Sequence, residues 1–239
     1  MSTYLFLPDV LRRIEQALDQ KRPLSLVRIG DGENIVLAQK SIWPIKKVMR
    51  EPWAHKSRRG QKGVTLPNLK ARDQIVRSIR AATIVGILPT NDTTIKAPAY
   101  LKRRLTNQLF KHYGLHPAFT CHACANRMMP QNPKFYQLLK GRRILILNKN
   151  PRHIKSLLER PPHHLKVTRT IRFSDYGQIN QTLKQVTAMR HSFDIALISC
   201  GINAVILAPQ IAQLTGKVAL DFGKAPRFLR TKAMSKPKL

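Results

Sequence analysis

The chain has 239 residues, of which 43 are Lys or Arg and only 12 are Asp or Glu, so its formal net charge at pH 7 is +31. A hydrophobic fraction of 43% supplies a folded core and excludes a globally disordered chain despite this charge. No uninterrupted apolar run of about 18–20 residues occurs, which argues against a transmembrane helix. The length fits one α/β domain better than two small ones.

The N-terminus and the cysteines predict a cytoplasmic protein. The first nine residues lack the basic segment and the cleavage site of a signal peptide. Three cysteines, an odd number in a chain of this size, do not form a disulfide framework. We therefore expect a reducing cytoplasm, and the positive charge allows peripheral contact with anionic lipid at the inner face of the membrane.

The first predicted elements are a helix, a strand and an acidic turn. Apolar residues at helical spacing predict a helix over residues 8–21, and the apolar run 24–29 predicts a buried strand. The strand runs into residues 28–33, Arg-Ile-Gly-Asp-Gly-Glu, and a helical stretch opens at residues 35–38. A strand, a glycine-rich turn and a helix in this order are where an open α/β sheet places its ligand.

The acidic turn is the candidate metal site. Asp31 and Glu33 present two hard oxygen ligands, which suit a divalent cation such as Mn²⁺ or Mg²⁺ that bridges the protein to a substrate diphosphate. Arg28 adds positive charge, while Gly30 and Gly32 allow a tight turn or a close approach to phosphate. The alternative is an ordinary turn with Asp as the cap and glycine at positive φ.

The middle of the chain alternates between helices and strands. Residues 41–66 form an irregular basic segment in which we predict no regular element. Helices are predicted over residues 68–81 and 98–113, with Gly114 ending the second, and a strand over residues 83–88 lies between them.

The second half predicts a regular alternation of strands and helices. Strands are expected at residues 143–147, 165–171, 194–200 and 218–221, and helices at residues 151–159, 176–189 and 202–214. Continuous apolar strands of this kind indicate a mostly parallel sheet flanked by helices. We predict a single Rossmann-like α/β domain over residues 1–223, followed by a basic tail over residues 224–239.

Polar residues follow several of the predicted strands. Asn91 and Asp92 lie after the strand at residues 83–88, and Asp221 ends the last strand, so these residues are candidates for ligand contact or for the general base. Gly201 and Asn203 lie between a strand and a helix, where backbone amides bind phosphate. Turn capping and close packing are the respective alternatives.

The motif at residues 28–33 resembles the Arg-Phe-Gly-Asp-Gly-Glu signature of the GT-D-fold glycosyltransferases, bacterial enzymes that transfer sugar from a nucleotide sugar to a glycan. Residues 119–127, 199–208 and 216–223 follow in the family's order, so the resemblance spans roughly residues 20–224. Only the first motif is specific. The resemblance implies a GT-D-type fold, a metal at the Asp-X-Glu motif, and a role for Arg127 in the central segment.

Two positions depart from the family's pattern. Lys224 follows Gly223 where the family has His, and Asn203 stands where Pro or a small residue is usual. A lysine at position 224 adds a cation that can pair with phosphate, unless it only begins the basic tail. An altered donor or acceptor, or a member without activity, both fit these departures.

We predict a metal-dependent glycosyltransferase with catalytic residues Asp31, Glu33 and Asp221. Its donor is a nucleotide sugar, with a UDP-sugar as the leading candidate. The acceptor is a glycan, a glycoprotein or a lipid-linked molecule. Metal and Arg28, with Arg127, would stabilise the departing nucleoside diphosphate. The alternatives are a non-catalytic α/β protein that binds nucleic acid or another polyanion, and a nucleotide-binding phosphotransferase. An aromatic fraction of only 6% and the lack of a recognised binding module disfavour nucleic acid.

Overall fold

The structure is a computed structural model, and it describes residues 2–229. Eight parallel strands form one sheet in the order β1-β4-β3-β2-β8-β7-β5-β6. In that order the strands are Thr3–Leu5, Phe119–His122, Ile84–Ile87, Leu24–Ile29, Val218–Asp221, Ile195–Ser199, Arg143–Asn148 and Lys166–Arg172. The predicted α/β fold with a parallel sheet flanked by helices is confirmed.

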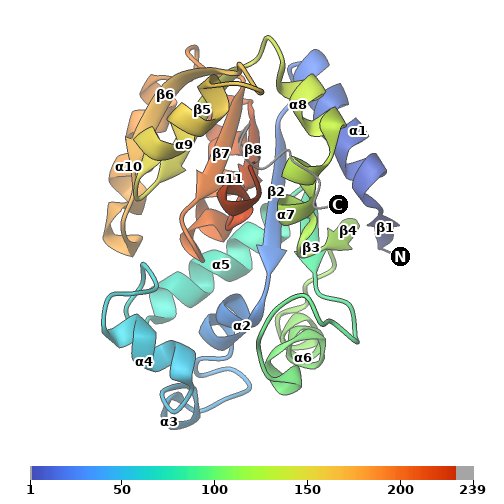
Figure 1. The fold of residues 1–239 in the computed structure, drawn as a ribbon. Coiled ribbons are helices and arrows are strands. Elements are labelled where there is room, and N and C mark those ends of the chain that lie inside the picture. The colour runs from blue at the N-terminus through green and yellow to red at the C-terminus, as the bar shows by residue number, and fades with distance from the viewer. Residues whose placement is uncertain (1, 230–239) are drawn as a thin grey trace, which may run out of the picture.

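Helices flank the sheet and gather beyond the carboxyl end of β2, where α2, α3, α4 and α6 lie together (Figure 1). The helices are α1 (Leu7–Asp19), α2 (Asp31–Leu37), α3 (Ile45–Val48), α4 (Pro52–Arg58), α5 (Leu69–Ala81), α6 (Arg103–Tyr113), α7 (Ala125–Met128), α8 (Pro133–Leu139), α9 (Pro151–Glu159), α10 (Ile179–Ala188) and α11 (Asn203–Thr215). Four 3₁₀ turns complete the described elements: η1 (Ala99–Leu101), η2 (Met129–Gln131), η3 (Tyr176–Gln178) and η4 (Ala225–Phe228). Within residues 2–229, no helix has the length and apolar character needed to cross a bilayer.

Two hydrophobic cores lie on opposite faces of the sheet, because successive strand residues point to opposite sides. In β2, Val27 and Ile29 join the core formed with α2, α5, α10 and α11, whereas Leu24 and Leu26 join the core formed with α1, α8 and α9. Strands buried on both faces explain the continuous apolar runs in the sequence.

The acidic motif folds differently from the prediction. Helix α2 begins at Asp31, four residues before the predicted helical stretch, so Asp31 and Glu33 lie in the first turn of a helix. The Glu33 side chain accepts a hydrogen bond from the Gly30 amide at 2.9 Å, which is the capping-box contact that starts the helix. Carboxylates in a first turn are also favoured by the helix dipole.

Two other predictions about local structure were wrong. The segment 41–66, predicted to be irregular, contains α3 and α4, which begin after Pro44 and at Pro52 respectively. The single helix predicted over residues 98–113 is broken at Lys102 into η1 and α6. The side chain of Lys102 is buried and its Nζ lies 3.0 Å from Asp92 Oδ2, so a tertiary ion pair overrides the local helical preference.

The packed body extends past the predicted boundary at residue 223. Residues Ala225–Phe228 form η4, and Ala225 and Leu229 are buried in the core beside Phe222. These apolar side chains explain why the start of the predicted tail is held on the body. The rest of that tail, residues 230–239, lies outside the described residues.

Asn34 joins α2 to the segment that precedes α6. Its side chain is fully buried, and its Nδ2 donates to Leu101 O at 2.8 Å, to Lys102 O at 3.2 Å and to Thr106 Oγ1 at 2.9 Å. These bonds hold the helix that carries the acidic motif against η1 and α6.

Asn34→Ala should lower the free energy of unfolding by about 1–3 kcal/mol, because it leaves the buried Leu101 carbonyl without this donor and removes one of the hydrogen bonds to Lys102 O. Asn107→Ala, on the exposed side of α6, is the matched control and should change it by less than about 0.5 kcal/mol. Urea unfolding measures both, and equal losses in the two variants would contradict the bracing role of Asn34.

Candidate functional site

A cavity of about 820 Å³ opens at the carboxyl ends of the central strands. Residues that follow β2, β3 and β7 line it, together with α4, the loop before η1, and Lys224. β2 pairs with β3 on one side and with β8 on the other, so segments from the two halves of the chain meet at this edge of the sheet. Open α/β sheets bind ligands outside the carboxyl ends of their strands.

The acidic pair lies on the cavity wall. Asp31 is half-buried, and Glu33 is buried with 4% of its surface exposed. Gly30 is extended, with φ −117°, and Gly32 is helical, so the alternative of an ordinary turn with glycine at positive φ is wrong here. The glycines instead permit close approach: a Cβ on Gly32 would lie 2.7 Å from Trp53 Nε1, and one on Gly30 would lie 3.1 Å from Glu33 Oε2.

Arg28 and Asp221 join the two strands at the centre of the sheet. Arg28 Nε lies 3.5 Å from Asp221 Oδ2, and the Asp221 side chain has no exposed surface. Burial on its own would lower the pKa of Arg28, but the carboxylates of Asp221 and Glu33 raise it above its usual value. Arg28 therefore remains a cation and faces the cavity, whereas Asp221 contacts Arg28 from the interior and lies off the cavity wall.

The Asp221 carboxyl has an unusual environment. Burial raises its pKa to about 7; the positive charge of Arg28 opposes this shift, and the negative charge of Glu33 adds to it. A carboxyl buried behind Arg28 positions that guanidinium, and it does not reach an acceptor in the cavity. The geometry therefore favours a positioning role for Asp221 over the general base that was considered from the sequence.

Positive charge surrounds the acidic pair. Lys62, Arg127, Lys224 and Arg227 line the same cavity as Arg28. The pKa of Lys224 is lowered, first by partial burial and then by Arg127, Arg227, Arg28 and Lys62 in turn. Like charges packed in this way create a strong attraction for an anion. A diphosphate is an anion that several such cations can bind at once.

The turn before α11 combines a cavity residue with a structural one. Gly201 has φ +60°, which favours glycine, and it lines the cavity together with Ile202. Asn203 is fully buried, and its Nδ2 donates to Gly63 O at 2.7 Å. This bond fixes the segment that carries Lys62, so the side chain of Asn203 shapes the cavity from behind its wall.

Asn91 and Asp92 do not line the cavity. Asn91 is exposed, and Asp92 accepts hydrogen bonds from the amides of Thr94 at 3.1 Å and Ile95 at 3.2 Å. Burial would raise the pKa of Asp92, but hydrogen bonds from Thr94 and Lys102 lower it to about 2. Asp92 thus holds the loop after β3 in place, and that loop forms part of the cavity wall.

Several wall residues were not identified from the sequence, among them Trp53, Lys62 and Tyr100. Trp53 packs on Gly32, and Lys62 Nζ lies 5.6 Å from the centre of the Trp53 ring. Tyr100 donates a hydrogen bond to Glu51 Oε2 at 3.0 Å, which links η1 to the residue before α4. A tryptophan within the basic segment was the available signal, because an aromatic ring among cations is typical of a binding surface.

The side chains of the cavity can be compared with the ligands that a divalent metal requires. Among residues 2–229, no three His, Cys, Asp or Glu side chains are arranged to hold one ion. Asp31 and Glu33 supply two carboxylates on the cavity wall, and Mg²⁺-type sites commonly take one or two carboxylates and complete their sphere with substrate phosphates and water. The residues therefore fit a metal that binds together with a diphosphate.

The raised pKa of Asp221 predicts a stability that falls as the pH rises. Between about pH 4 and pH 7 the folded carboxyl binds more protons than the unfolded one, so the free energy of unfolding should decrease by up to roughly 4 kcal/mol. Asp221→Asn should remove this component, whereas Asp19→Asn, at an exposed acid, should retain it. Urea unfolding at several pH values tests this; an unchanged slope in Asp221→Asn would contradict the assignment.

Comparison with known proteins identifies the fold. The family model of the GT-D fold-like domain matches residues 6–229. A selenomethionine-substituted structure of domain of unknown function 1792 (DUF1792) aligns with TM-score 0.59 and 14% identity over 94% of this chain and 79% of that one. A structure described as a new glycosyltransferase (DUF1792) from Streptococcus sanguinis aligns with TM-score 0.58 and 14% identity over 95% and 82% of the two chains. No curated protein sequence matches. Because the family model covers nearly all of the described residues, the protein belongs to the GT-D-like family.

Proposed function

We propose that the protein is a glycosyltransferase that uses a nucleotide-sugar donor and a divalent metal, Mn²⁺ or Mg²⁺. A UDP-sugar is the leading candidate for the donor. The observation that carries this proposal is the single cavity that combines Asp31 and Glu33 with a ring of cations at the centre of the sheet. Membership of the GT-D-like family and the fold shared with the glycosyltransferase from Streptococcus sanguinis support it.

The residues around the departing nucleoside diphosphate have different roles in this proposal. Asp31 and Glu33 would hold the metal, which would supply Lewis-acid stabilisation of the diphosphate when bound. Arg28, fixed by Asp221, places a permanent cation beside them, and Arg127 and Lys224 add further positive charge. Such preorganised charge stabilises a leaving group more than water does, because it need not reorient during the reaction.

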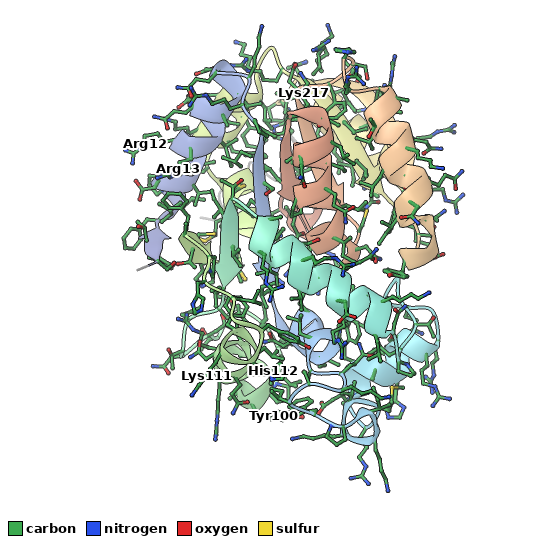
Figure 2. All side chains as sticks on the ribbon, turned by 180° about the vertical axis from the view of Figure 1, so that it is seen from behind. Arg12, Arg13, Tyr100, Lys111, His112 and Lys217 are labelled. Carbon is green, nitrogen blue, oxygen red and sulfur yellow. The ribbon has the colours of Figure 1, made fainter. Side chains whose placement is uncertain are left out.

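The acceptor in this proposal is a glycan, a glycoprotein or a lipid-linked molecule. Figure 2 shows nitrogen-tipped side chains projecting all around the outline of this view, among them Arg12 and Arg13 of α1, Lys111 of α6, and Lys217. Charge spread over the whole surface attracts anionic membranes and other polyanions without specifying a single binding face. It is therefore consistent with a cytoplasmic enzyme that makes peripheral contact with an anionic membrane, and with polyanion binding as the alternative function.

Asp31→Asn should abolish stabilisation of the protein by UDP and Mn²⁺ together, because it replaces an anionic metal ligand by a neutral one. Thermal unfolding with UDP, Mn²⁺, both or neither provides the measurement. Glu33→Gln should have the same effect on binding and should also destabilise the free protein, because Glu33 is buried and caps α2.

Glu15→Gln, at a half-buried acid of α1 that does not line the cavity, is the control and should leave ligand stabilisation unchanged. Wild-type response to UDP and Mn²⁺ in both site variants would show that the metal assignment is wrong. Stabilisation of the wild type by DNA or RNA alone, lost steeply with salt, would instead favour the polyanion-binding alternative.

Lys224→Ala should weaken UDP binding about three- to tenfold, because it removes one cation from the diphosphate region. Lys224→His should make the remaining binding depend more strongly on Mn²⁺, since neutral His supplies no fixed charge. Titrations of both variants with UDP, with and without Mn²⁺, measure these effects. Affinities within twofold of wild type would show that Lys224 takes no part in the site.

A further inference from the structure

A second cavity, of about 800 Å³, lies at the carboxyl ends of β5 and β6. Asn148 is the last residue of β5, Arg172 is the last residue of β6, and Pro151 is the first residue of α9. The proposed chemistry at the acidic motif makes no use of this hollow. Its volume is within the range of small-molecule binding sites, about 300–1,000 Å³.

The lining of the second cavity is suited to an anion. Lys149, Arg152 and Arg172 converge on it, and no acidic residue lines it. Each of the three side chains is exposed, and none of them forms an ion pair with another described residue. Exposed cations are common on this protein, so the distinguishing observation is that three of them share one hollow with the polar side chains of Asn148, Asn150 and Thr170.

The backbone around the cavity is held in place by the asparagine that ends β5. Asn148 Nδ2 donates to Ser199 O at 2.9 Å, and Asn148 Oδ1 accepts from the Asn150 amide at 2.7 Å. The loop between β5 and α9 is therefore tied to β7. No side chain caps the start of α9, so the positive end of its dipole adds to the attraction of the three cations.

The second cavity adjoins the first. Lys149 lines both, and Phe173 and Ser174, which follow Arg172, line the first. A molecule anchored in the second cavity would therefore present its other end to the donor diphosphate. That is the position an acceptor must take.

We propose that the second cavity binds a phosphate group carried by the acceptor, with Arg152 and Arg172 as its main ligands. The role as acceptor site rests on the proposed function; the binding of phosphate does not. Arginine suits this task because its planar fork donates two hydrogen bonds to one oxyanion.

Inorganic phosphate is the first probe, titrated into ¹⁵N-labelled protein with and without saturating UDP and Mn²⁺. Amide shifts of Lys149, Asn150, Arg152 and His153 should report binding in both conditions, and the double variant Arg152→Gln/Arg172→Gln should bind about tenfold more weakly at these amides. The matched control Lys166→Gln/Arg190→Gln removes two exposed cations next to the amino ends of β6 and β7, and it should bind phosphate like the wild type.

The outcomes separate this inference from the proposed function. If phosphate binding weakened equally in both double variants, the loss would come from overall charge and the inference would be overturned. Loss of phosphate binding on saturation with UDP would place the cavity in the donor site and also overturn it. If UDP does not bind at all, the proposed function fails, while the titration without nucleotide still tests the phosphate site.

Two further arms identify the source of the phosphate group. Glucose 1-phosphate represents a soluble acceptor phosphate, and phosphatidylcholine vesicles with and without phosphatidic acid represent a lipid-linked one. In at least one arm the Arg152→Gln/Arg172→Gln variant should bind about tenfold more weakly than the Lys166→Gln/Arg190→Gln control. Indistinguishable binding of the two double variants in both arms would overturn an acceptor phosphate in this cavity.

Discussion

The pair formed by Arg28 and Asp221 is the contact on which the candidate site depends. β2 and β8 are neighbours in the sheet although they lie near opposite ends of the chain, and these two residues join them at the point where the site begins. A Cβ on Gly223 would lie 2.8 Å from Arg28 Nε and 2.6 Å from Asn126 Nδ2, so only glycine leaves room for the guanidinium. Although the pair is buried, Arg28 keeps its charge available to a ligand, because it also faces Glu33 and the cavity.

Burial of charge is expensive, and this protein concentrates it where it can act on a ligand. Burial raises the pKa of Asp221 to about 7, and the carboxylates of Asp221 and Glu33 in turn raise the pKa of Arg28 and keep it charged. Asp92 shows the opposite arrangement, because Lys102 and several hydrogen bonds keep it ionised. One carboxylate thus positions a cation of the site, and the other fixes a loop of its wall.

The two cavities lie along one edge of the sheet, because all eight strands are parallel and their carboxyl ends share a side. β2, between β3 and β8, ends at the first cavity, and β5, between β7 and β6, ends at the second. In the first opening, acids and cations together suit a metal-bound diphosphate. In the second, cations stand without acids and suit a phosphate alone. A donor and an acceptor side by side are what group transfer requires.

Local patterns in the sequence determined the α/β class, the strands from β5 to β8 and the helix that begins at Pro151, because each is a continuous apolar run or a periodic one with a clear start signal. The Asp-X-Glu motif also stood out, because acids are scarce in a chain with 43 basic residues. Tertiary structure alone decided which acids face the ligand. Asp92 follows a strand and Asp221 ends one, but their partners differ. Lys102, ten residues along the chain, breaks a predicted helix to reach Asp92, whereas Arg28 reaches Asp221 between the neighbouring strands β2 and β8. The second contact depends on the order of strands in the sheet, which local periodicity does not encode.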